Sequence, residues 1–212
     1  MHHFIFPKKD TWISSGSSNI DGTSFKDQNF GRDEILELKK EFFNFTFDYP
    51  TRALIHFDLS DISESIVRSD STGPEKNIRS PKFFLRLFEA EGNKELSTEY
   101  TITALPLSQS WDEGRGKFGD NPKVTNGASW ENRSFPDNGT AVTWSQATDG
   151  TQFHGGSYRT GSFVASQSFS YESPDIDLEV TDIVNGWFDG TINDGNNYGF
   201  LLKFSGSQET DT

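Results

Sequence analysis

The sequence predicts an all-β fold, with two packed sheets joined by long loops and one or two short helical turns. Hydrophobic residues recur at every second position in several short segments, as they do in half-buried strands. The 212 residues include 20 Phe and 19 Gly, a composition that suits strands joined by turns. No apolar run approaches the roughly 18 residues of a transmembrane helix.

The first quarter of the chain is expected to contain strands separated by polar turns. We predict strands at residues 4–13 with a break at Pro7, at 35–38, at 43–47 and at 52–58. Residues 14–29 read as a polar loop, and Tyr49 and Pro50 as a turn. In the last of these strands Ala53, Ile55 and Phe57 share one face, which predicts a core-facing side.

The middle of the chain begins with further regular elements and then loses its periodicity. Ser60 and Asp61 offer oxygens that start one helical turn. Strands are predicted at 83–88, before a turn at residues 92–93, and at 100–104, which ends at Pro106.

Residues 111–162 carry no periodic pattern, yet they contain Trp111, Trp130 and Trp144. Because so long a structureless loop is uncommon in a compact domain, we expect these three indoles to pin it to the sheets. We also hypothesise that this segment is an assembly element, ordered mainly by contacts with neighbouring proteins.

Residues 175–204 are the stretch around which the rest is organised. A strand at 176–180 precedes a short helix, capped by Thr181 or Asp182, and a strand at 200–204 follows. Gly190 marks the helix end, and Trp187 is predicted to plug one end of the core.

The bulk composition restricts partners and domain number. Residues 1–212 have no linker and no internal repeat, so we expect one domain. The net charge of −13 disfavours binding to nucleic acid or to an anionic membrane. The chain has no Cys, and its start lacks the pattern of a secretion signal, so we expect synthesis in a cytoplasm.

Several segments in order resemble the DNRLRE domain family. They are residues 10–13 (DTWI), 29–31 (NFG), 51–59 (TRALIHFDL), 111–114 (WDEG), 127–130 (GASW), 178–184 (LEVTDIV) and 198–202 (YGFLL). The resemblance implies a jelly-roll-like antiparallel β-sandwich related to carbohydrate-binding modules. Members continue past the last Gly-Phe strand, whereas residues 208–212 read as a polar loop, so a C-terminal strand is expected to be missing.

Two motifs suggest ligands that their context does not support. Residues 114–119 match GxGxxG, but no apolar strand precedes and no helix follows, so we interpret them as a loop without a cofactor. Asp175, Asp177 and the turn at 193–197 offer oxygens to a structural Ca²⁺ without specifying a site. We therefore expect no cofactor, with that Ca²⁺ as the alternative.

Aromatic residues give the main binding alternative. Trp111 and Trp187 lie in the family-like motifs and are read as structural, while Trp144 and Tyr158 are equally compatible with sugar stacking and with the core. The histidines, His56 among them, are scattered, and no nucleophile turn or Cys-based metal centre is present. We expect no catalytic, cofactor or metal residues and no enzymatic activity.

A stand-alone domain of this family is similar to the versions found among structural proteins of tailed bacteriophages. The first functional hypothesis is therefore a virion protein of the capsid surface, neck or tail, made in the host cytoplasm. It would form a homo-oligomer in the assembled particle and bind other virion proteins. The alternative is a carbohydrate-binding module that attaches to a cell-surface polysaccharide, and a small polysaccharide-degrading enzyme ranks third.

Overall fold

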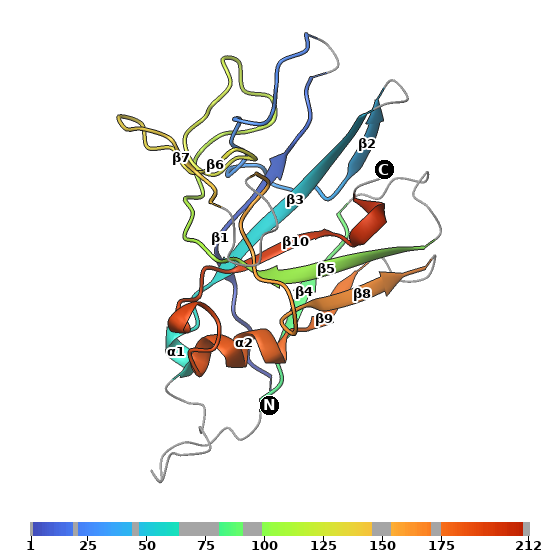
Figure 1. The fold of residues 1–212 in the computed structure, drawn as a ribbon, viewed down its shortest axis with the longest axis vertical. Helices are drawn as coiled ribbons and strands as arrows, with labels where there is room; N and C mark the ends of the chain where they lie inside the picture. The colour runs from blue at the N-terminus through green and yellow to red at the C-terminus, as the bar shows by residue number, and fades with distance from the viewer. Residues whose placement is uncertain are drawn as a thin grey trace.

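The computed structural model describes residues 2–18, 21–43, 47–63, 81–90, 99–145, 154–170 and 175–209. Within them the strands are β1 (Pro7–Ser14), β2 (Lys40–Phe43), β3 (Phe47–Phe57), β4 (Phe84–Leu87), β5 (Tyr100–Pro106), β6 (Asn132–Ser134), β7 (Val142–Thr143), β8 (Ala165–Phe169), β9 (Ile176–Glu179) and β10 (Phe200–Phe204) (Figure 1). Two short helices, α1 (Ser60–Ser63) and α2 (Thr181–Phe188), join 3-10 turns at Asn193–Gly195 and Gly206–Gln208. The predicted all-β sandwich is confirmed, and no helix in this part of the chain is long and apolar enough to cross a membrane.

The main sheet has the strand order β1-β3-β10-β5-β8, with β2 paired to the far end of β3, and all pairs are antiparallel. β10 lies between β3 and β5, so that Leu201 is opposite both Leu54 and Leu105. β4 and β9 form a separate pair, and β6 and β7 form a third small sheet. The last strand of the described chain is therefore central in the sheet.

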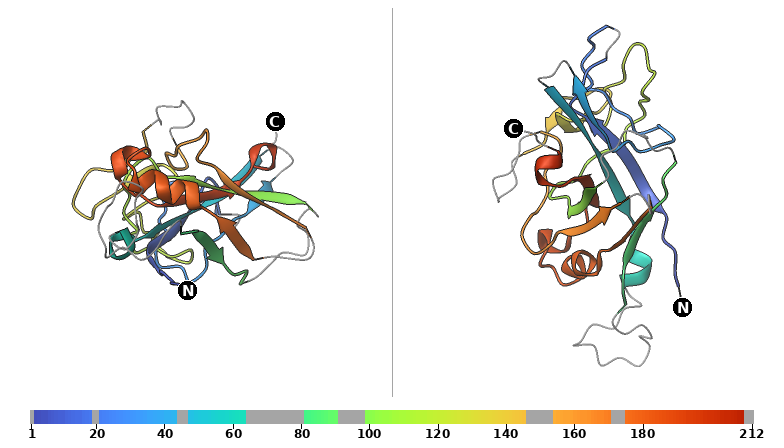
Figure 2. Two further views of the ribbon diagram at one scale, coloured as in Figure 1. Left: turned by 90° about the horizontal axis from the view of Figure 1, so that it is seen from below. Right: turned by 90° about the vertical axis from the view of Figure 1, so that its right-hand side faces the viewer.

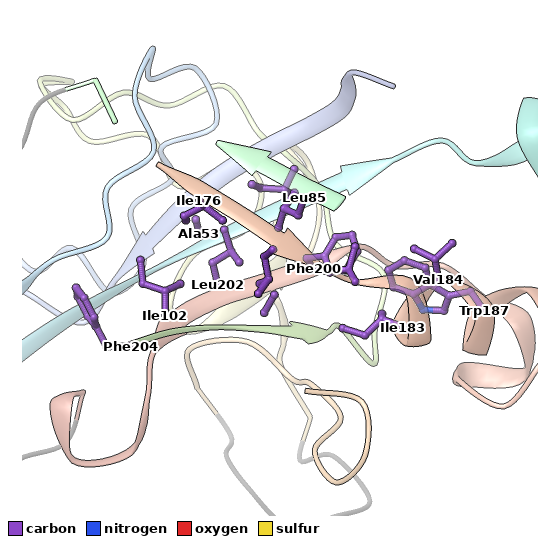
Figure 3. Close-up of a cluster of buried hydrophobic side chains, with 14 of the residues drawn as sticks. Ala53, Leu85, Ile102, Ile176, Ile183, Val184, Trp187, Phe200, Leu202 and Phe204 are labelled. Atoms are coloured by element: carbon purple, nitrogen blue, oxygen red, sulfur yellow. The ribbon is translucent and has the colours of Figure 1, made fainter. Parts of the chain in front are cut away.

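One face of the main sheet packs against α2 and the β4–β9 pair. Ala53 of β3 and Phe200 and Leu202 of β10 lie in this first hydrophobic cluster (Figure 3). Ile55 of β3 belongs to the same cluster. Trp187 of α2 is 3% exposed and meets the Phe200 ring edge-on at 5.0 Å. Trp187 thus closes one end of the core, as its spacing predicted.

The opposite face of the sheet is covered by the segment that lacks periodicity. Leu54, Leu105 and Leu201 pack against Trp111 and Trp144, both 1% exposed, in a second cluster. The two indole nitrogens donate to backbone oxygens at 2.9 Å. Trp130 is partly buried against the same cluster, so the prediction that three indoles pin this segment is confirmed for residues 111–145 and 154–162.

Contacts within one chain hold the described part of that segment, which is residues 111–145 and 154–162. Its backbone is hydrogen-bonded through pairs such as Ala128 with Asp112 and Gly155 with Trp130. The hypothesis that neighbouring proteins supply most of the ordering contacts is therefore not needed for these residues.

A buried ion pair attaches the C-terminal segment to the sheet. The Arg52 and Glu209 side chains are each 1% exposed and form two hydrogen bonds, of 2.7 Å and 3.1 Å. Lys203 also contacts Glu209, and the Arg52 guanidinium lies 4.7 Å from the Trp130 ring centroid and bonds the Gly155 carbonyl. Since these charges satisfy one another away from water, removing one partner would leave the other uncompensated.

The N-terminal half departs from the predictions at two places. Residues 35–38 are not a strand, because Thr51 binds this segment through its side chain: its hydroxyl donates to the Glu37 carbonyl and accepts from the Lys39 N–H. Tyr49 and Pro50 do not form a turn but belong to β3. Pro50 is tolerated there because it lies where β1 has ended, and its carbonyl still accepts from the Ser15 N–H.

Other boundaries differ in smaller ways. The first strand begins at Pro7, and residues 4–6, which were predicted to precede it as a strand, are not in one. Residues 44–46 and the predicted turn at 92–93 lie outside the described residues. The predicted cap of α2 is wrong: the N-cap is Val180, without a side-chain bond, because the Thr181 hydroxyl instead accepts from the N–H of Phe83, the residue before β4. The helix ends before Gly190, whose φ of 84° suits glycine, as predicted.

Replacing Trp187 by Ala is expected to lower the free energy of unfolding by about 3–5 kcal/mol, because it opens a cavity beside Phe200. The measurement is urea denaturation followed by far-UV circular dichroism. Phe88→Ala, at a side chain that is 80% exposed, is the matched control and should be close to neutral. An unchanged midpoint for Trp187→Ala would contradict the packing described above.

Candidate functional site

The residues singled out for sugar stacking are part of the core in this structure. Trp144 is 1% exposed and its indole donates to the Ser129 carbonyl, while Tyr158 is 7% exposed and lies beside Arg52. Neither ring presents an open face to solvent. The sugar-contact interpretation of these two residues stays untested, and an exposed stacking surface has to be sought among other side chains.

The side chains predicted to offer oxygens to Ca²⁺ bond other parts of the chain. Asp177 forms two 3.0 Å bonds with Arg86, and the Asn193 side-chain amide donates to the Leu107 carbonyl. In the part of the chain that the structure describes, no three His, Asp or Glu side chains are grouped to hold a metal ion. The Ca²⁺ alternative stays a prediction without a test.

Asn29 connects the loop before β2 to the loop that carries the GxGxxG motif. It is fully buried, and its amide donates to the carbonyls of Glu113 and Ala128 at 2.7 Å and 2.8 Å. Its side-chain oxygen accepts from the N–H groups of Gly31 and Gly116 at 3.1 Å and 2.8 Å. The four hydrogen-bonding positions of this amide are therefore satisfied by two distant parts of the chain.

The glycines around Asn29 are required by close backbone approach. A Cβ atom on Gly31 would lie 2.1 Å from the Glu113 carbonyl oxygen, and one on Gly116 would lie 2.2 Å from that of Asn29. No side chain can fit at such distances. In the GxGxxG motif, Gly114 and Gly116 are therefore required by the packing of two loops around the Asn29 amide, whereas Gly119 has open space around it.

Four aromatic rings, which we call the aromatic platform, lie beside this junction: Trp12, Phe25, Phe30 and Phe118. Trp12 is stacked on Phe30 with centroids 3.8 Å apart. Phe118 lies 6.3 Å from Trp12 and 5.6 Å from Phe25, and 51% of it is exposed. The platform therefore has a buried base, formed by Trp12 and Phe30, and one ring that faces water. The loops at residues 21–30 and 113–126, blue and yellow-green, lie at the end of the molecule away from α1 and α2 (Figures 1 and 2).

Polar side chains of the preceding loop fix the backbone of Phe118. Its N–H donates to Asp33 Oδ1 at 3.1 Å, and Asp33 Oδ2 accepts from the Trp12 indole at 2.8 Å. Gln28, which is 1% exposed, donates to the Lys117 carbonyl at 3.0 Å. Because these bonds already fix the backbone of Phe118, the residue loses little conformational freedom when a ligand binds to its ring.

Charged groups surround the exposed ring. Lys39 Nζ lies 5.8 Å from the ring centroids of both Trp12 and Phe118, within the range of a cation–π contact. Lys117 binds Glu34 at 2.6 Å, and this hydrogen bond raises the pKa of Lys117 and lowers that of Glu34. The rim thus offers charged donors and acceptors next to a flat apolar ring, a combination that suits hydroxyl-rich ligands.

The sequence pattern could not identify this platform. Phe118 stands alone in a Gly-rich loop, and contacts of Gln28, Asn29 and Asp33 bring it beside Trp12. The signal available was Trp12 in a predicted strand followed by the NFG triplet at 29–31, which the sequence interpretation assigned to the fold alone.

A family model described as "Carbohydrate-binding module family 96" matches residues 3–154, more than half of the 212 residues. The matched range includes the Asn29 junction and the whole aromatic platform. No curated protein and no solved structure matches the chain.

Asn29→Ala is expected to destabilise the protein by about 3 kcal/mol, because the buried N–H groups of Gly31 and Gly116 lose their acceptor. Chemical denaturation measures the loss, and hydrogen exchange should show faster exchange of those two amides. Asn185→Ala, at an exposed position of α2, is the control and should have little effect. Equal stability of the two variants would mean that Asn29 does not hold the loops together.

Proposed function

The chain belongs to carbohydrate-binding module family 96, and from that premise we propose that it binds a polysaccharide through the aromatic platform. The observation that supports this most directly is Phe118, an exposed ring whose backbone is fixed by Asp33. The face of an aromatic ring accepts the C–H face of a sugar by apolar contact. Lys117 precedes Phe118 in the sequence and pairs with Glu34, and these exposed charged groups can bond hydroxyl groups of a sugar.

The platform is open, and this geometry favours the interior of a polymer chain. Phe118 is half exposed, so a ligand can reach its ring directly from solvent. A long chain can therefore cross the platform without entering a closed pocket. Binding of this kind attaches the protein to a polysaccharide surface and requires no catalytic group.

The virion hypothesis finds no support in the fold, the site or the comparisons. Structural roles in a capsid, neck or tail, the virion location, oligomers and virion partners stay predictions that nothing here tests. The carbohydrate-binding alternative rests on the family match and on the platform, and we adopt it as the proposed function.

Phe118→Ala is expected to weaken polysaccharide binding about tenfold, which corresponds to about 1.4 kcal/mol, because the stacking surface is lost. Affinity electrophoresis in gels containing xylan, mannan, laminarin or polygalacturonate measures the retardation. Phe88→Ala removes an equally large exposed ring from β4's end and should bind as the wild type does. Equal retardation of the two variants would exclude the platform as the site.

We also expect no hydrolase or lyase activity on the same polysaccharides. Carbohydrate-binding modules act by attachment, and the platform contains no nucleophile and base in bonding contact. Reducing-end detection and absorbance of unsaturated products measure both reactions. Turnover that disappears on replacing one carboxylate would contradict this prediction.

A further inference from the structure

The small sheet of β4 and β9 is closed along one edge and open along the other. At the β9 edge, the side-chain amide of Gln167 in β8 accepts from the Asp177 N–H at 2.9 Å and donates to the Asp175 carbonyl at 3.1 Å. Gln167 thus takes the place of a neighbouring strand. At the β4 edge, no strand pairs with this sheet in the described part of the chain.

The hydrogen bonds to β9 show which groups β4 presents at its open edge. In an antiparallel pair, successive residues face the partner strand alternately. The Val180 N–H donates to the Phe83 carbonyl at 2.8 Å, so Phe83 faces β9. Phe84 and Arg86 consequently direct their N–H and C=O groups away from β9. Among the residues described, these main-chain groups have no hydrogen-bond partner.

This edge lacks the features that protect edge strands from pairing with another chain. Proteins commonly place free charges or proline on such strands. The one charged side chain of β4, Arg86, is bound to Asp177 by two 3.0 Å hydrogen bonds. The rings beside it are apolar and exposed, by 50% at Phe84 and by 80% at Phe88. β4 is therefore a short apolar template for a further strand.

Residues 2–6, which we call the N-terminal arm, match this template. Their sequence, HHFIF, ends in three residues of high strand propensity. Phe4 and Phe6 are 70% and 83% exposed while Ile5 is partly buried, which is the alternation of an extended strand. Pro7 favours an extended conformation at Phe6. The arm forms no strand pairing and no hydrogen bond with the other residues that the structure describes.

Charge and position indicate that the arm which fits the β4 edge belongs to a second copy of the chain. A net charge of −13 makes whole copies repel one another. By contrast, the arm is followed by Lys8 and Lys9 and contains no acidic residue, whereas Glu89 and Asp175 lie at one end of β4. The chain's own arm is part of the structure and forms no hydrogen bond with the described groups of β4.

We propose that two copies of this protein exchange N-terminal arms, so that residues 2–6 of each copy add as a strand to the β4 edge of the other. Reciprocal exchange is closed by a two-fold axis, and association therefore stops at two copies. The arm extends towards the end of the molecule where α1 and α2 lie, away from the loops that carry the aromatic platform (Figures 1 and 2). Arm exchange consequently leaves both platforms open. Because the added contacts are few, the dimer is a weak one, with a Kd of about 10–100 μM.

Sedimentation equilibrium of the 212-residue protein, from about 1 μM to about 1 mM, tests this proposal. The wild type is expected to shift from monomer to dimer across this range. Deletion of residues 2–6 should weaken self-association at least about tenfold. Arg86→Pro should do the same, because it removes an N–H at the open edge and no hydrogen bond to β9. Arg86→Ala keeps that N–H, so it is the matched control and should dimerise as the wild type does.

A mixture of two variants identifies exchange of the arm specifically. The chain without residues 2–6 retains an edge, and the Arg86→Pro chain retains an arm, so the two should associate with each other although neither associates with itself. Far-UV circular dichroism checks that Arg86→Pro is folded. If it is not, Phe84→Lys takes its place in both experiments, since a free charge at this edge opposes strand addition.

Hydrogen exchange followed by NMR gives an independent measurement. The Phe84 and Arg86 amides should become more protected as the wild-type concentration rises, whereas the Leu85 amide, which faces β9, should not change. A wild type that stays monomeric at all concentrations would overturn the proposal. So would a dimer that survives deletion of the arm, because the interface would then be β4 against β4 or another surface. Concentration-independent protection of the Phe84 and Arg86 amides that is lost on deletion would assign the edge to the chain's own arm, and would overturn it as well.

Discussion

The main sheet is buried on both of its faces, and the remaining structure follows from that constraint. Ile55 and Leu54 are adjacent in β3, yet each is at most 1% exposed, because they point into different hydrophobic clusters. Antiparallel sheets commonly leave one face to water, with an alternation of apolar and polar residues. Here both faces need a cover. α2 and the β4–β9 pair provide it on one side, and Trp111 and Trp144 provide it on the other.

Much of the sheet could be predicted because period-2 patterns are local. β5, β10 and the 52–57 part of β3 lie where alternation placed them, and Trp187 occupies the predicted core position. Predictions failed where a tertiary contact replaced a local preference. Thr51 binds residues 37–39 through its hydroxyl, and the Thr181 hydroxyl bonds Phe83 instead of capping α2. Neither contact leaves a signature in the neighbouring sequence.

Less of the candidate site than of the fold could be predicted from the sequence. Trp144 and Tyr158 were candidates because large aromatic rings are common in sugar sites. They lie in the core instead, since a loop that covers a sheet face without regular strands needs large apolar side chains there. The ring left in water is Phe118, and its position depends on the Asn29 amide joining residues that are 84 to 99 apart in the chain. Such a junction is a property of the folded chain alone.

The position of β10 has a consequence for synthesis. Since residues 200–204 separate β3 from β5, neither strand can acquire its sheet partner on that side until almost the whole described chain has left the ribosome. The Arg52–Glu209 pair, which joins residues 157 positions apart, forms at the same late stage. During elongation the apolar edges of β3 and β5 are unpaired, a state that favours association between nascent chains. The sheet is consequently completed late, and contacts this distant in sequence make folding slow relative to helical proteins of the same length.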